Sequence, residues 1–517
     1  MNTKNCLLIY FCFFIYLFFI GCKNKSGDPF VDMHFDSYDA NLNKRVEAYQ
    51  DATFPNLANT KEGNPSMYID FSSGIFQAFK TTPANIDFLK AVYGNLSGNL
   101  DVFRLNNDSI LPITSSNSDL VGRMVVDQNN YQKVYAPIKD AVTKIVAKNN
   151  DALLITDFEE YYPSPNRSEI LDIPYLKEAF ISWLSKGNTI HFFVSNYKEN
   201  GVDKHLYFTV FNCGNSSKTG MISKVENSLS ALPRFDLSNK SYKLSQDYGA
   251  EKTGGIFYDN TTNNEKKKNL LDLNKDTYIN GLQNNNNFEF YQFGLDWATI
   301  NQLKEEYQKQ NQFKDFFRKL YIDISKEDAY IVGDLDVKVY DVTEDFENFA
   351  KCNEVLKHRP KLEKGSNGED KFSDTEKDEI ALSCYDTKGK IKDEWVYKNK
   401  KSTNIDEVFS LNKELFTNTK TTDKKKVELA VNFDPKFNIK NITNPKGLLR
   451  VDIVLNNATP NTSNPNLDTL FKWTSAVPQN KGKYNVALLE SIKNTLIDEK
   501  VKPANKTIYS YYIKTLQ

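Results

Sequence analysis

Between residues 66 and 212 the chain alternates short strands that are apolar along their whole length with amphipathic helices. A strand that is apolar throughout is buried on both faces, and helices on either side of a sheet can provide that burial. The alternation therefore predicts an α/β domain with a doubly wound sheet. The expected strands are 67–70, 100–106, 109–113, 152–157, 189–197 and 204–211, and the expected helices are 75–80, 85–96, 135–150 and 173–187.

Two of these strands end on an aspartate. Asp70 follows "MYI", and Asp157 follows "ALLIT". In open α/β sheets, functional side chains gather at the carboxyl ends of the strands. We therefore expect the two carboxylates to face one crevice at the same edge of the sheet.

The stretches around these aspartates resemble three successive landmarks of a von Willebrand factor type A domain. They are "YIDFSSG" at 68–74, "APIKDAV" at 136–142 and "LLITDFEE" at 153–160. The metal-ion-dependent adhesion site of that family has Asp-x-Ser-x-Ser after the first strand, a Thr in a later loop and an Asp before Gly after the fourth strand. The resemblance covers 66–212, and it implies a protein-binding domain that holds Mg²⁺.

Magnesium prefers near-octahedral oxygen ligation and keeps several waters, so one position stays open for a partner's carboxylate. Asp70, Ser72 and Asp157 match three of the five ligand positions of the family. The resemblance therefore implies that these three side chains are the metal ligands, with Mg²⁺ as the cofactor.

The chain also departs from the family pattern. Gly74 stands where the second Ser belongs, Ala136 where the Thr belongs, and Phe158 where Gly follows the second Asp. Ser73 is the candidate for replacing a lost ligand from a shifted turn, and Glu159 or Glu160 could add negative charge. One alternative is a different α/β fold. Another is a degenerate site without metal, in which Asp70 and Asp157 are remnant polar groups or helix caps. Two close carboxylates would then repel, and the pKa of at least one would rise.

The segment 157–165, "DFEEYYPSP", is both acidic and aromatic. Aromatic residues on loops can anchor a protein interface. The candidate partner-binding residues are Phe158, Glu159, Glu160 and Tyr161, and a solvated loop is the alternative.

The N-terminal segment has the pattern of a secretory signal: Lys4, an apolar run over 6–21, and Cys22 after "FFIG". "FFIGC" resembles a bacterial lipobox, which implies a signal peptide over 1–21, a lipid on Cys22 and a polar tether over 22–64. We therefore expect a bacterial cell-envelope protein held to a membrane by its N-terminal lipid. An uncleaved membrane anchor is the alternative, because the apolar run approaches the length that spans a bilayer.

The expected α/β domain with a mixed extension covers 65–320, and a β-rich, sandwich-like domain with one helix covers 321–517. Helices are expected at 269–282, 295–320 and 485–501. Strands are expected at 319–325, 329–342, 379–389, 393–399, 425–433, 448–457 and 507–516. Three cysteines follow Cys22 in the sequence: Cys213, Cys352 and Cys384. One alternative is a disulfide between Cys352 and Cys384, and the other is that all three are free thiols.

The formal net charge is −1, so no basic excess indicates a nucleic-acid partner. Common hydrolase and nucleotide-binding signatures are also missing from the sequence. We expect a non-catalytic adhesion or scaffold module that binds another protein of the envelope. One alternative is a metal-dependent envelope hydrolase using Asp70 and Asp157 with Glu159 or Glu160. Another is a carbohydrate-binding surface lipoprotein that uses tyrosines and tryptophans of its C-terminal domain.

Overall fold

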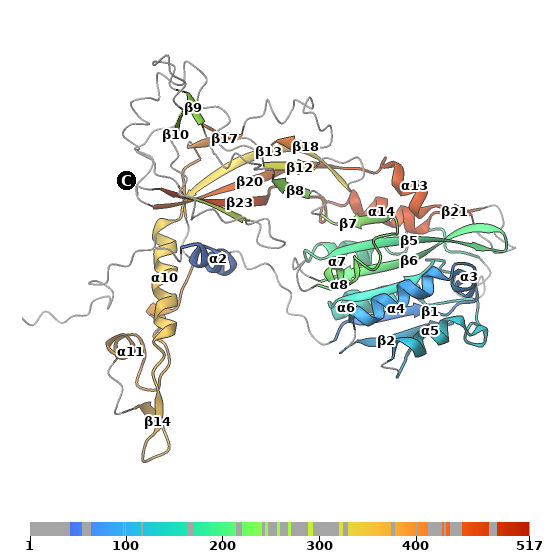
Figure 1. Ribbon diagram of the computed structural model, residues 1–517, viewed down its shortest axis with the longest axis horizontal. Coiled ribbons are helices and arrows are strands. Elements are labelled where there is room, and N and C mark those ends of the chain that lie inside the picture. Colours follow the sequence, from blue (N-terminus) through green and yellow to red (C-terminus); the bar gives the residue numbers. More distant parts are fainter. Residues whose placement is uncertain are drawn as a thin grey trace, which may run out of the picture. The chain divides into compact units, whose positions relative to one another are not determined.

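The structure is a computed structural model whose described residues fall into two compact units (Figure 1). One unit comprises residues up to 49 together with 343–401, and the other comprises 50–342 and 402–517. The expected signal peptide, Cys22, most of the tether and most of the helices expected at 269–282 and 295–320 lie outside the described residues. The described residues are 42–53, 64–96, 98, 100–114, 117–162, 169–213, 220–239, 243–246, 256–258, 267–269, 288–292, 320–323, 329–373, 378–399, 402–406, 408–411, 426–428, 431–434, 447–474 and 483–515.

The larger unit contains a seven-stranded mixed sheet in the order β3-β2-β1-β4-β6-β5-β7. Strand β1 pairs in parallel with both β2 and β4, and the other pairs in the sheet are antiparallel. The strands are β1 (Ser66–Asp70), β2 (Asp101–Asn106), β3 (Ser109–Pro112), β4 (Ala152–Thr156), β5 (Thr189–Glu199), β6 (Val202–Asn212) and β7 (Arg234–Leu237).

The antiparallel half of this sheet differs from the doubly wound sheet that the sequence predicts. Strands β5 and β6 form a hairpin whose two-residue turn is Asn200-Gly201, both with positive φ. Asn-Gly favours the type I′ turn, which matches the twist of a hairpin. The chain therefore returns directly beside β5, and β6 lies between β4 and β5 instead of a second parallel strand. This turn is not among the elements predicted from the sequence.

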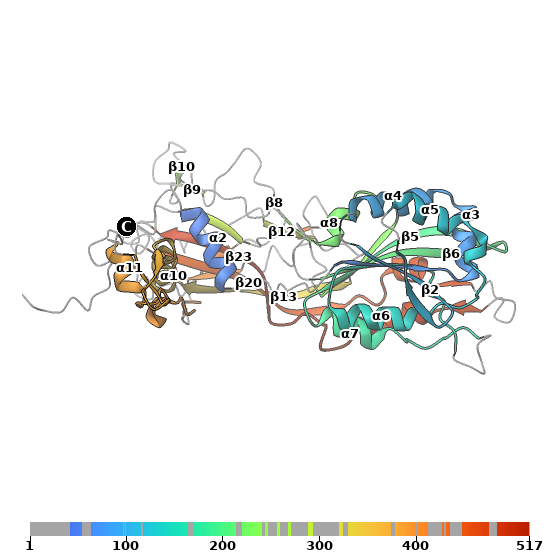
Figure 2. The same cartoon turned by 90° about the horizontal axis from the view of Figure 1, so that it is seen from below.

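Helices cover both faces of the sheet, as Figure 2 shows. Along β1, Met67 and Ile69 belong to one buried cluster and Tyr68 to the other, which confirms that this strand is buried on both sides. On the Met67 side lie α3 (Ser73–Thr81), α4 (Ala84–Leu96), α5 (Ser118–Val126) and α8 (Met221–Val225). On the Tyr68 side lie α6 (Ile138–Lys148) and α7 (Lys177–Leu184), and η1 (Gln128–Asn130) follows α5.

Two helices from the C-terminal part of the sequence, α13 (Pro465–Phe471) and α14 (Ala487–Leu496), pack on the α7 side of this sheet. The hydroxyl of Tyr207 on β6 donates to the carbonyl of Leu470 at 2.6 Å, and the ring of Phe471 stacks on that of Tyr207. The Ser491 hydroxyl accepts from the backbone N–H of Leu176 at 3.2 Å. Residues far apart in the sequence therefore share one core.

The larger unit also contains further sheets, which are mostly antiparallel and draw many of their strands from the C-terminal part of the sequence. A five-stranded sheet has the order β11 (Phe288–Gln292), β23 (Lys506–Thr515), β20 (Gly447–Pro460), β13 (Tyr330–Asp341) and β16 (Thr403–Asn404), and in it only β11 and β23 are parallel. A three-stranded sheet has the order β18 (Lys426–Glu428), β12 (Leu320–Asp323) and β8 (Lys243–Gln246). The two-stranded sheets pair β9 (Ile256–Tyr258) with β10 (Lys267–Asn269), β17 (Phe409–Leu411) with β19 (Val431–Phe433), and β21 (Trp473–Thr474) with β22 (Tyr484–Asn485).

The smaller unit is built around a helix that the sequence analysis did not expect, α10 (Thr343–Lys357). Tyr49 packs edge-on against Phe346 and Phe349, and its hydroxyl donates to Asp345 Oδ2 at 2.7 Å. The unit also contains β14 (Leu362–Lys364) paired with β15 (Asp370–Phe372), α11 (Glu379–Cys384) and η2 (Asp393–Trp395), while α2 (Leu42–Thr53) begins in it.

The strands expected at 379–389 and 393–399 are wrong, because these segments begin with α11 and η2. Asp378 caps α11 by accepting from the backbone N–H groups of Ile380 and Ala381. The described cysteines are buried, and Cys352 and Cys384 are not joined in a disulfide, so the disulfide expected as one alternative is not formed. Among the described residues, no helix is both long enough and apolar enough to cross a membrane.

Candidate functional site

Asp70 and Asp157 lie at the same edge of the sheet, where the neighbouring parallel strands β1 and β4 end. The pairing of Ile69 with Ile155 places Asp70 opposite Thr156. The Asp70 side chain is buried, and both of its oxygens accept hydrogen bonds: Oδ1 from the backbone N–H of Ser72 and Oδ2 from the Thr156 hydroxyl, each at 2.7 Å. Burial and the nearby charge of Asp157 raise the pKa of Asp70 to about 7, against the opposing effect of these hydrogen bonds.

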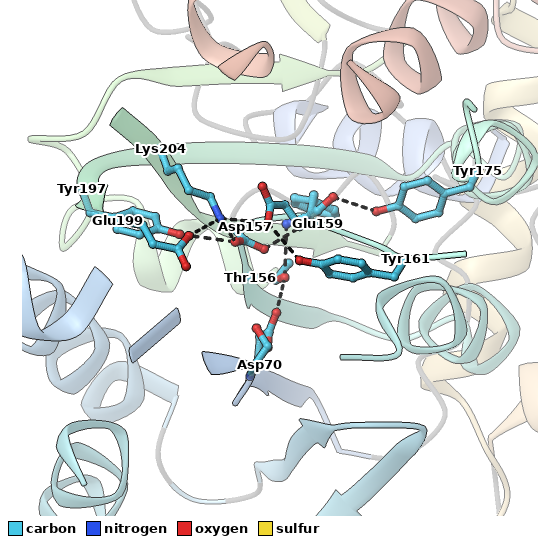
Figure 3. Close-up of polar contacts among 11 residues, drawn as sticks. Asp70, Thr156, Asp157, Glu159, Tyr161, Tyr175, Tyr197, Glu199 and Lys204 are labelled. Atoms are coloured by element: carbon cyan, nitrogen blue, oxygen red, sulfur yellow. Dashed lines mark hydrogen bonds and ion pairs between the residues drawn. The ribbon is translucent and has the colours of Figure 1, made fainter. Parts of the chain in front are cut away.

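A buried lysine lies beside Asp157 (Figure 3). Lys204 comes from β6, and its side chain is 0% exposed. Its ammonium group lies 2.8 Å from Asp157 Oδ2, 3.0 Å from Glu159 Oε2 and 2.7 Å from Glu199 Oε2. Burial acts to lower the pKa of Lys204, but the negative charges of Asp157 and Glu159 hold it well above its ordinary value. The lysine is therefore a cation inside a carboxylate cluster.

Glu159 adds a third carboxylate to this cluster from the loop after β4. Its backbone N–H donates to Asp157 Oδ1 at 3.0 Å, and its Oε2 contacts Lys204 and accepts from the Tyr161 hydroxyl at 3.5 Å. Its Oε1 is buried and has no hydrogen-bond partner among the residues that the structure describes. Burial raises the pKa of Glu159 to about 7, although Lys204 acts in the opposite direction.

Phe158, between these two acidic residues, has a backbone conformation that bulky residues rarely adopt. Its φ is +57°, in the left-handed region that favours glycine. Its side chain is fully buried beside Phe192 and Tyr207, and its carbonyl accepts from the Tyr175 hydroxyl at 3.2 Å. The backbone therefore has a glycine-like conformation at the position where the resemblance places Gly.

A second departure from the family pattern also has a spatial explanation. A Cβ atom added at Gly74 would lie 3.1 Å from Glu199 Oε1 and 3.3 Å from Glu199 Oε2. Such a contact is tighter than side chains normally make, so the carboxylate of Glu199 takes up space beside Gly74 that a serine side chain would need. Ala136, at the expected Thr position, is buried and offers no side-chain oxygen.

The segment after Glu159 reaches the surface. Glu160 Oε2 accepts from the backbone N–H of Lys139 at 2.7 Å, in the first turn of α6. The Tyr161 ring meets that of Tyr135 edge-on, with centroids 4.9 Å apart. Tyr162 donates to Asp172 Oδ1 at 2.6 Å.

The structure thus places the predicted residues in two groups. Asp70, Ser72, Asp157, Phe158 and Glu159 are buried, whereas Glu160 and Tyr161 are partly exposed. Four further polar side chains complete the buried group and are not predicted from the sequence: Thr156, Tyr197, Glu199 and Lys204. An Asn-Gly turn pairs Glu199 with Val202 and Tyr197 with Lys204, so recognising that turn would have placed Glu199 and Lys204 close to each other on one hairpin.

The described residues contain no group of three or more His, Cys, Asp or Glu side chains arranged to hold a metal ion. The Mg²⁺ site at Asp70, Ser72 and Asp157 stays a prediction. No family model matches the chain, and no curated protein sequence or solved structure matches it significantly.

Proposed function

We propose that this chain is a lipid-anchored protein of the bacterial cell envelope that binds another protein through a von Willebrand A-like domain. The proposed anchor is the lipid on Cys22, and the proposed role is adhesion or scaffolding. The binding surface lies at the carboxyl edge of the seven-stranded sheet, beside Asp70 and Asp157. This edge is where an α/β sheet presents its functional residues.

One observation carries the proposal most: Asp70 ends β1, Asp157 follows the adjacent parallel strand β4, and the two buried carboxylates are close enough for the charge of Asp157 to raise the pKa of Asp70. The strand order β3-β2-β1-β4, with helices on both faces, supports the same type of domain. The positive φ of Phe158 adds support, since the family has Gly at that position.

The surface around this edge has the composition of a protein interface. Tyr135 and Tyr161 contact each other and are partly exposed, and Val134 and Ile173 are 49% and 51% exposed. Partly exposed tyrosines offer a large contact area at a small cost in conformational entropy, and they are enriched in interfaces. We propose that the partner covers Tyr135 and Tyr161, with Glu160 beside them.

Co-purification from native membranes with a tagged full-length chain tests this proposal. A Tyr135→Ala/Tyr161→Ala chain should lose a stoichiometric partner, while Ile497→Ala should keep it, because Ile497 is 53% exposed directly after α14 and outside the proposed surface. Retention of the partner by the double variant would contradict the proposed surface. The same purification with and without chelator tests whether Mg²⁺ takes part.

The two alternatives from the sequence predict different results. A metal-dependent hydrolase would release product from phosphoester or glycan substrates and would lose this activity in Asp70→Ala. A carbohydrate-binding protein would retain glycans on an array whether or not Tyr135 and Tyr161 are replaced. If no protein partner is recovered under any condition, these assays become the next tests.

A further inference from the structure

Four carboxylates, from Asp70, Asp157, Glu159 and Glu199, are gathered at the carboxyl edge with little exposure to solvent. Carboxylates removed from water are unfavourable unless a cation or a proton balances their charge. In the metal-dependent sites that the sequence resembles, a divalent ion would provide that charge. Here a side chain of the chain itself lies among them.

The Lys204 ammonium group is fully engaged in this cluster. An ammonium has three N–H donors, and three carboxylate oxygens lie within 3.0 Å of Nζ, one each from Asp157, Glu159 and Glu199. Two of these residues follow β4, whereas Glu199 ends β5 and Lys204 lies on β6. The lysine therefore joins the hairpin to the end of the parallel strand.

We propose that Lys204 is a built-in cation of this edge and takes the charge-balancing role that Mg²⁺ has in metal-dependent adhesion sites. A divalent ion at Asp157 would have to share its carboxylate oxygens with an ammonium at hydrogen-bonding distance. Magnesium requires near-ideal octahedral oxygen ligation at about 2.0–2.1 Å, which this arrangement of donors does not offer. The residues present do not fit Mg²⁺ while Lys204 stays in place.

Gly74 and Glu199 belong to the same arrangement. The carboxylate of Glu199 lies where a side chain at position 74 would point, and it also binds Lys204. The serine ligand that the resemblance expects at 74 is therefore replaced by a carboxylate–ammonium pair from the β5–β6 hairpin.

This inference extends the proposed function. Its consequence, that partner binding needs no divalent metal, rests on that proposal. The metal binding of the purified chain is independent of the proposed function, because it can be measured without any partner. A failed partner experiment and a failed metal experiment are therefore distinguishable.

The test measures Mn²⁺ binding to the purified full-length chain by electron paramagnetic resonance. Added Mg²⁺ shows whether the two ions compete for the same site. The wild type should have no saturable Mn²⁺ site at this edge, so Asp157→Asn should leave Mn²⁺ binding unchanged. Lys204→Ala leaves three carboxylates without their cation, and it should gain a site that binds Mn²⁺ at least about tenfold more tightly than the wild type. Lys198→Ala is the matched control, because Lys198 pairs with Asp203 on the same hairpin but is exposed.

A stoichiometric Mn²⁺ site in the wild type that Asp70→Asn or Asp157→Asn abolishes would overturn the proposal. A folded Lys204→Ala chain that binds no more Mn²⁺ than the wild type would also overturn the substitution of metal by lysine. If Lys204→Ala does not fold, Lys204→Gln and the wild-type measurement decide. Thermal unfolding provides a second readout, in which Mg²⁺ should raise the Tm of the lysine variants and leave that of the wild type unchanged.

Discussion

The carboxylate of Glu199 lies against the α-carbon of Gly74, so closely that a Cβ at position 74 would be 3.1 Å from Glu199 Oε1. Gly74 is in the first turn of α3, and Glu199 is the last residue of β5. Glu199 therefore leaves little room for a side chain at position 74. The effect of replacing Gly74 on the free energy of unfolding should depend on whether Glu199 is present.

Gly74→Ala tests this dependence. Ala is the better helix former by about 1 kcal/mol in a helix interior, but in the wild type its Cβ would crowd Glu199. We expect Gly74→Ala to be more favourable in a Glu199→Ala background than in the wild type, with a coupling energy of about 0.5–3 kcal/mol. Urea unfolding of the four chains of this double-mutant cycle measures it. Additive effects of the two substitutions would contradict the contact.

Removing the buried lysine should be far more damaging than removing an exposed one. Lys204→Ala leaves Asp157, Glu159 and Glu199 buried without their cation, and we expect a loss of about 3–5 kcal/mol in the free energy of unfolding. Lys198→Ala, which breaks the exposed pair with Asp203, should cost less than about 1 kcal/mol. Chemical denaturation of both variants at pH 7 checks the difference. Similar small losses would show that the cluster does not depend on Lys204.

Phe158 should reverse the usual order of alanine and glycine. Both Phe158→Ala and Phe158→Gly lose the buried ring, at about 3–5 kcal/mol, but only Gly accepts the positive φ without strain. We expect Phe158→Gly to be about 1–2 kcal/mol more stable than Phe158→Ala. The control is Phe192 on β5, where Gly should be the less stable of the two replacements. If Gly were more stable than Ala at both positions, or less stable at both, the positive φ of Phe158 would be contradicted.

A separate ion pair gives a prediction for pH. Asp236 Oδ1 lies 2.8 Å from His191 Nδ1 and 2.6 Å from Arg234 Nε, and Arg234 also contacts Glu226. Burial acts to raise the pKa of Asp236, but the charges of His191 and Arg234 hold it well below its ordinary value. Because the pKa is lower in the folded chain, the stabilisation is present above the unfolded pKa and is lost as pH falls through the folded value.

Asp236→Asn should therefore lower the free energy of unfolding at pH 7 by about 1–2 kcal/mol. The difference from the wild type should shrink below pH of about 4, where the unfolded carboxyl takes up its proton. Denaturation curves at several pH values measure this trend, with the exposed Asp203→Asn as the control. A difference that stays constant down to acid pH would show that Asp236 contributes through something other than its charge.

The sequence was informative where a local pattern determined the structure. The apolar runs at 67–70 and 152–156 predict strands that are buried on both faces, and the structure confirms this. Because these two strands are parallel neighbours, the aspartates at their carboxyl ends lie at the same edge of the sheet. The segment 379–384 was misjudged because a short apolar run does not distinguish a strand from a helix. The cap at Asp378 was the signal that could have corrected it.

The partners of the two aspartates were harder to predict, because they come from the β5–β6 hairpin. Whether Lys204 is a solvated charge or a buried cation depends on which strand lies beside β4, and a pairing of distant strands is not a local property. The Asn-Gly turn fixes the register within the hairpin but not its neighbour in the sheet. The sequence therefore predicts the carboxylates of Asp70 and Asp157 at this edge but not the buried ammonium group of Lys204.

The central claim, that the carboxyl edge binds a protein, is tested most directly by site-specific photocrosslinking in living cells. A photoreactive amino acid at Tyr161 or Val134 should form a crosslink to one protein of the envelope. The same group at Ile497, which is exposed directly after α14, should not. Our account predicts that the crosslinks at Tyr161 and Val134 form equally well with and without chelator. Crosslinks only at Ile497, or none at Tyr161 and Val134, would contradict it.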